Sequence, residues 1–77
     1  MADKKYGAVR ALIKADRANR GLSQSAYAAQ VGINLPTLQR WEAGTAAPGG
    51  LMTAKLIASG ISAVHLILAF EQDTEES

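Results

Sequence analysis

The stretch QSAYAAQVGINLPTLQRWEA, residues 24–43, decides how this chain folds. Its apolar residues fall at helical spacing in two short runs. Gly32 separates the runs, at a point where a left-handed backbone conformation costs least without a Cβ atom. The residues expected to be buried are small or apolar: Tyr27, Ala28, Val31, Ile33, Leu38 and Trp41. The stretch therefore predicts two short helices joined by a tight turn, with Ala28 where the two helices approach most closely.

Capping residues extend this interpretation to the whole chain. Ser23 and Asn34 are good N-caps for the two helices, and Pro36 falls in a first turn, where a missing N–H costs nothing. Gly21 and Gly44 are stop signals. No segment alternates with the period of a strand. The sequence predicts an all-α fold with helices over about residues 5–20, 24–31, 35–43, 51–59 and 63–70.

Composition excludes several classes of function. A chain of 77 residues with no Cys and a single His offers little material for a metal site or a nucleophile–base pair. The N-terminus lacks the apolar run of a signal peptide. The longest uncharged stretch, residues 56–70, is shorter than the roughly 20 residues that a membrane span needs. We expect a soluble, cytoplasmic protein without a cofactor, metal or catalytic residues, and therefore not an enzyme.

The net charge of +1 hides an uneven distribution. Residues 1–70 hold all eight Lys and Arg residues against three acidic ones, which gives +5, whereas residues 71–77 hold four acidic residues, which gives −4. A basic body is suited to phosphate binding. We expect residues 1–70 to form a DNA-binding domain and residues 71–77 to be a disordered acidic tail. The tail either keeps the protein soluble or competes with DNA for the basic face.

The order and spacing of the two helices within residues 24–43 are those of a DNA-binding helix-turn-helix. Three motifs lie in and around this stretch: GLSQ at residues 21–24, the turn at Gly32, and W-E-x-G-x-x-x-P from Trp41 to Pro48. With these motifs the chain resembles the Cro/C1-type (XRE) helix-turn-helix family of phage repressors, Cro proteins and antitoxins. The resemblance implies a compact five-helix, lambda-repressor-like bundle. It also implies a homodimeric regulator of transcription, similar to a phage repressor, that binds a palindromic operator with its third helix in the major groove.

The resemblance also implies which residues touch DNA. Gln24 matches a phosphate contact of the family, and Arg40 can read guanine or clamp a phosphate. Leu35 and Pro36 depart from the polar residues usual in the family. Three alternatives are open: they pack on thymine methyl groups, they make few base contacts, or they face a protein partner. The expected DNA-binding residues are Gln24, Asn34, Leu35, Pro36, Thr37, Gln39, Arg40 and Thr45.

Two further contacts are expected. Arg17 and Glu42 match a salt bridge that joins the first and third helices in the family, although Arg17 can also be a member of an exposed basic stripe. The last helix has more apolar residues than one face needs, which indicates a dimer interface or a helix that wraps the core. The expected interface residues are Val64, Leu66, Ile67, Leu68 and Phe70. An alternative function is that of an antitoxin, which binds a toxin protein and represses its own operon.

Overall fold

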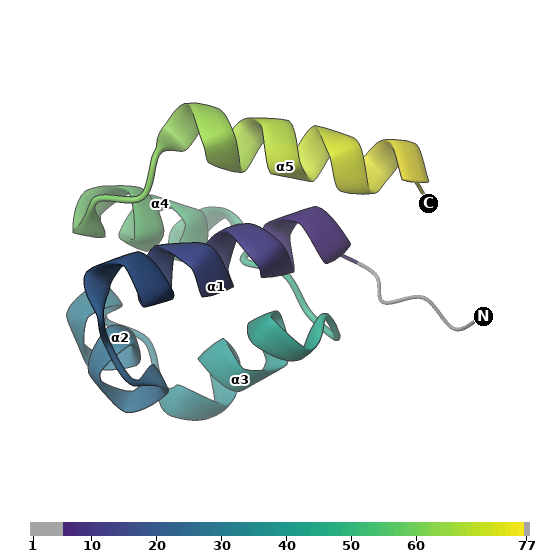
Figure 1. The fold of residues 1–77 in the computed structure, drawn as a ribbon. Coiled ribbons are helices and arrows are strands. Elements are labelled where there is room, and N and C mark those ends of the chain that lie inside the picture. The colour runs from purple at the N-terminus through teal and green to yellow at the C-terminus, as the bar shows by residue number, and fades with distance from the viewer. Residues whose placement is uncertain (1–5, 77) are drawn as a thin grey trace.

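Five helices account for most of the chain (Figure 1). The computed structural model describes residues 6–76, and within that range it contains no strand. The helices are α1 (Gly7–Arg20), α2 (Gln24–Val31), α3 (Leu35–Ala43), α4 (Gly50–Ser59) and α5 (Ala63–Glu76). The first four agree closely with the predicted ranges, although the expected start at Lys5 lies outside the described residues. No helix in this part of the chain combines the length and the apolar character needed to cross a membrane.

The helices begin and end where the sequence predicts. Ser23 Oγ accepts a hydrogen bond from the Ala26 N–H at 3.1 Å, and Asn34 Oδ1 accepts one from the Thr37 N–H at 3.2 Å. Each cap satisfies a backbone donor that has no partner inside its own helix. The two caps therefore fix the starts of α2 and α3, the two helices of the predicted motif.

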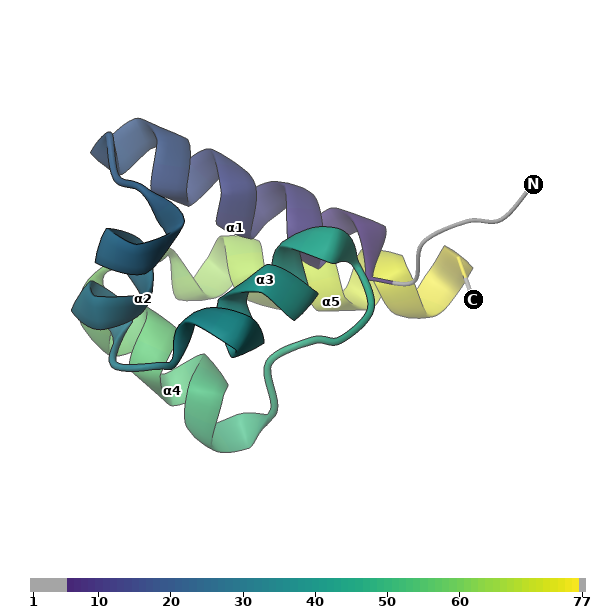
Figure 2. The ribbon, with the colours of Figure 1, turned by 90° about the horizontal axis from the view of Figure 1, so that it is seen from below.

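α1 runs through the middle of the fold, with α5 on one side and α3 on the other (Figure 1). α2 packs against α3 and α4. Seen from below, α3 lies in front and α5 behind (Figure 2). All five helices contribute to one core, whose largest buried side chains are Val9, Ile13, Tyr27, Leu38, Trp41, Leu56 and Leu66. This core holds α3 at the surface on the side of the molecule opposite α5.

The C-terminal segment differs from the sequence prediction. We expected the last helix to end at Phe70 and residues 71–77 to be disordered, but α5 continues to Glu76, and Ser77 lies outside the described residues. The physical reason is a contact that the sequence does not reveal. Asp73 accepts hydrogen bonds from the backbone N–H groups of Ala8 at 2.7 Å and Val9 at 3.1 Å. A carboxylate is favoured there because the first turn of α1 presents unpaired N–H groups and the positive end of the helix dipole.

Candidate nucleic-acid interface

The turn between α2 and α3 is held from both of its sides. Gly32 has a φ of +91°, the left-handed conformation that glycine adopts without strain. The N–H groups of Gly32 and Ile33 both donate to the Ala28 carbonyl, at 2.9 and 3.0 Å. On the other side, Lys55 Nζ of α4 donates to the Gly32 carbonyl at 2.9 Å. These contacts fix the direction in which α3 leaves α2.

α3 has a buried face and an exposed face. Leu38, Trp41 and Glu42 point into the protein and are at most 7% exposed. Pro36, Gln39 and Arg40 are exposed, while Leu35 and Thr37 are partly exposed. The exposed face of α3 therefore carries the predicted groove-facing residues, and no helix of the described fold lies in front of it in the view from below (Figure 2).

The polar residues of this face are already connected to one another. Thr37 Oγ1 donates to Asn34 Oδ1 at 2.5 Å and accepts from Arg40 Nη2 at 3.4 Å. Thr45 Oγ1 donates to the Arg40 carbonyl at 3.3 Å, beyond the end of α3. Asn34 and Thr45 therefore stabilise the two ends of α3, whichever contacts they make with DNA. The Arg40 guanidinium is exposed and only weakly held.

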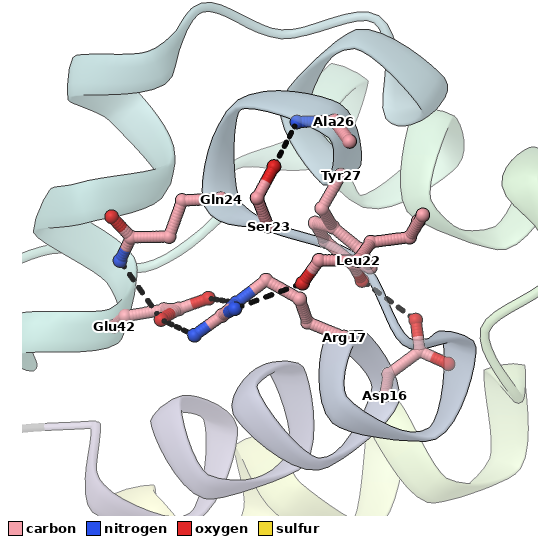
Figure 3. Close-up of polar contacts among 8 residues, drawn as sticks. All are labelled: Asp16, Arg17, Leu22, Ser23, Gln24, Ala26, Tyr27 and Glu42. Carbon is pink, nitrogen blue, oxygen red and sulfur yellow. Dashed lines mark hydrogen bonds and ion pairs between the residues drawn. The ribbon is translucent and has the colours of Figure 1, made fainter.

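Arg17, Glu42 and Gln24 form a polar cluster where α1, α2 and α3 meet (Figure 3). Arg17 donates to Glu42 through Nε at 2.7 Å and through Nη2 at 3.0 Å, which is the ion pair expected from the sequence. Its Nη1 donates to the Leu22 carbonyl at 3.0 Å. Gln24 Nε2 also donates to Glu42, at 3.0 Å, a contact that the sequence did not suggest. One carboxylate thus joins three helices.

Acid is expected to weaken the fold through Glu42. Burial alone would raise the pKa of this carboxyl, but hydrogen bonds from Arg17 and Gln24 outweigh burial and hold the pKa below its usual value. Because the folded pKa is the lower one, the stabilisation is present above the unfolded pKa of about 4.3 and is lost as pH falls through the folded pKa. In urea titrations between about pH 5 and pH 3, the free energy of unfolding should therefore fall more steeply for the wild type than for Glu42→Gln. Equal slopes for the two proteins would contradict this assignment.

A second cluster was missed by the sequence analysis. Tyr27 Oη donates to Asp16 at 2.7 Å, and Arg20 pairs with the same carboxylate at 2.8 Å. The Arg20 guanidinium also lies 5.1 Å from the centre of the Tyr27 ring. Burial and the hydrogen bond to Asp16 raise the pKa of Tyr27. The i, i+4 spacing of Asp16 and Arg20 was a usable signal. Arg20 is therefore a structural residue, and the basic surface is smaller than the residue count suggests.

The exposed apolar row of α5 is shorter than predicted. Val64, Ile67 and Leu68 are 65%, 57% and 54% exposed, but Leu66 is buried in the core and Phe70 is partly buried against it. Leu66 and Phe70 are four residues apart and so lie on the same face of the helix, whereas the other three lie on another face. Leu66 was wrongly assigned to an interface. Beside Leu68, α5 and the first half of α1 border a shallow groove of about 500 Å³, whose α1 side is formed by Gly7, Ala8, Ala11 and Leu12.

The structure places the predicted DNA-binding residues together and keeps them apart from the apolar row. Six of them lie on α3 or at its N-cap, Thr45 follows its C-terminal end, and Gln24 is joined to α3 through Glu42. The apolar row lies on α5, across α1 from α3 (Figure 1). Two separate surfaces are therefore available, one polar and one apolar.

This fold and this surface define a small all-α protein built around a helix-turn-helix whose second helix is presented to solvent. The family model described as helix-turn-helix matches residues 13–61, from within α1 to just beyond α4. The chain therefore belongs to the Cro/C1-type helix-turn-helix family of DNA-binding regulators of transcription. The predicted family and the predicted all-α fold are confirmed. Comparisons with curated protein sequences and with solved structures gave no significant match.

Proposed function

We propose that this protein is a sequence-specific regulator that binds a palindromic operator as a homodimer, with α3 in the major groove. The observation that supports this most is the exposed face of α3, where Gln39 and Arg40 stand on a helix held from behind by Leu38 and Trp41. A helix presented in this way fits the width of the major groove. The regulator acts as a repressor in the cytoplasm and has no catalytic role.

Each exposed residue has a proposed contact. Arg40 donates two hydrogen bonds to N7 and O6 of a guanine, and Gln39 reads an adjacent base, with adenine its best partner. Leu35 and Pro36 pack on thymine methyl groups. Gln24 contacts a phosphate, and Asn34, Thr37 and Thr45 lie near the sugar-phosphate backbone at the two ends of α3.

The homodimer is proposed to form through α5. Val64, Ile67 and Leu68 make an uncharged row on the surface, and Leu68 borders the groove between α1 and α5. A second copy would bury this row and fill the groove. The same apolar row supports a second candidate, an antitoxin that holds a toxin protein at α5 while α3 represses its operon.

Selection of bound duplexes from a random pool tests the proposed function directly. The expected product is a pair of inverted half-sites about one helical turn apart. Arg40→Ala should weaken binding to the selected site by roughly 1–3 kcal/mol and relax the preference at one base pair. Failure to enrich any sequence over scrambled competitor DNA would contradict sequence-specific binding. A single half-site without an inverted copy would contradict the homodimer.

A further inference from the structure

The side-chain amide of Gln24 is held in one orientation by a group that can only accept hydrogen bonds. Glu42 Oε1 accepts from Gln24 Nε2 and from Arg17 Nη2, both at 3.0 Å, and Glu42 Oε2 accepts from Arg17 Nε at 2.7 Å. An ionised carboxylate has no proton to donate, so the amide nitrogen must face it and the amide oxygen must not. Figure 3 shows the oxygen of Gln24 turned away from Glu42.

We propose that Glu42 is a positioning residue for DNA binding, which holds Gln24 so that Nε2 spans two acceptors. One N–H of the amide donates to Glu42, and the other donates to a DNA phosphate. The inference rests on the proposed function, since it requires α3 to dock on a duplex. It assigns to the Arg17–Glu42 pair a role beyond joining helices.

Preorganisation is the physical gain. A glutamine side chain loses considerable rotamer freedom when it is fixed, and a loosely held amide can also turn its oxygen toward the phosphate. In this protein the side chain is partly buried and already fixed before DNA arrives. DNA binding therefore does not have to supply the entropy cost of ordering the Gln24 side chain.

Charge balance makes the arrangement compatible with DNA. An isolated carboxylate beside a phosphate would repel it, but Arg17 binds Glu42 with two hydrogen bonds and neutralises its charge. The pair places a neutral unit behind Gln24, and the polar N–H of the amide is the group left to meet the phosphate. Lys or Arg is then not required at position 24 for a phosphate contact.

A double-mutant cycle on DNA affinity tests the proposal with the full-length chain and the selected duplex. Gln24→Ala should weaken binding roughly tenfold, as expected for the loss of a hydrogen bond to a charged group. Glu42→Gln should also weaken binding, because the neutral side chain can present either its oxygen or its nitrogen to Gln24. The double variant should bind about as well as Gln24→Ala alone, since the two changes remove one contact. The plot of log affinity against log salt should keep its slope in Gln24→Ala, because that slope counts phosphates neutralised by Lys and Arg and the glutamine amide carries no charge.

Asp16→Asn is the matched control. It also removes a carboxylate that pairs with an arginine and a buried side chain, but it does not touch Gln24. We expect this variant to be less stable and to keep the wild-type affinity for the selected duplex. If Glu42→Gln does not fold, Glu42→Asp takes its place in the cycle. This substitution keeps a carboxylate that can pair with Arg17, but its side chain is one methylene shorter.

Two outcomes would overturn the proposal. If the fold-losses in DNA affinity of the two single variants multiply in the double variant, Glu42 acts on α3 and not through Gln24. An unchanged affinity in Glu42→Gln or Glu42→Asp would mean that Gln24 needs no positioning. The unmutated protein tests the proposed function separately from the role of Glu42. If the unmutated protein prefers no duplex, sequence-specific binding is contradicted, and the inference loses its basis.

Discussion

Replacing Trp41 with alanine is expected to remove a large fraction of the protein's free energy of unfolding at 25 °C. Trp41 is 2% exposed and lies on the buried face of α3. Truncating a buried tryptophan to alanine costs about 3–5 kcal/mol, because its apolar contacts are lost and a cavity remains. A domain of this size has a total stability of roughly 4–12 kcal/mol. Circular dichroism in urea measures the effect, since the variant has no tryptophan to follow by fluorescence.

Gln39→Ala is the control for this experiment. It lies on the same helix two residues earlier, with its side chain exposed. Its free energy of unfolding should stay within about 0.5 kcal/mol of the wild type, while its preference for the selected operator should fall. A cost below about 1 kcal/mol for Trp41→Ala would show that α3 is not held mainly by this side chain.

The elements that the sequence predicts well are those determined by neighbouring residues. Ser23 and Asn34 cap helices through contacts only three residues long, and both contacts are present. The buried positions Tyr27, Leu38 and Trp41 follow from helical periodicity. Because these signals are local, the helix-turn-helix and the outward direction of Gln39 and Arg40 could be inferred without coordinates.

The features that the sequence did not reveal depend on how distant helices are placed. Asp73 reaches the first turn of α1 only because α5 runs antiparallel beside it, and this contact extends a helix that composition alone predicted to end at Phe70. Gln24 meets Glu42 for a similar reason, since α2 and α3 bring them together across a turn. Leu66 and Ile67 are equally apolar, and only the packing of α5 on α1 decides that Leu66 is buried and Ile67 exposed. These pairings are tertiary, so no local pattern encodes them.

Ile67→Asp is expected to dissociate the proposed homodimer and weaken operator binding as a result. Ile67 is 57% exposed in the single chain, so the change should leave the stability of the monomer nearly unchanged. In a two-fold symmetric dimer the same substitution occurs on both sides of the interface, where each copy places an unpaired charge against apolar side chains. Hot-spot residues at the centre of an interface contribute about 2–4 kcal/mol, so the dissociation constant should rise by roughly thirtyfold or more. Sedimentation equilibrium measures it.

Ile57→Asp separates a specific interface from a general effect of added charge. Ile57 is also an exposed isoleucine, but it lies on α4 and outside the α5 row. If the dimer forms through α5, this variant should sediment as the wild type does and bind the full operator with nearly wild-type affinity. Dissociation by Ile57→Asp and not by Ile67→Asp would move the interface to α4. If the wild type is a monomer that binds a single half-site, the homodimer is contradicted. The exposed row on α5 would then bind a different protein, as the antitoxin alternative requires.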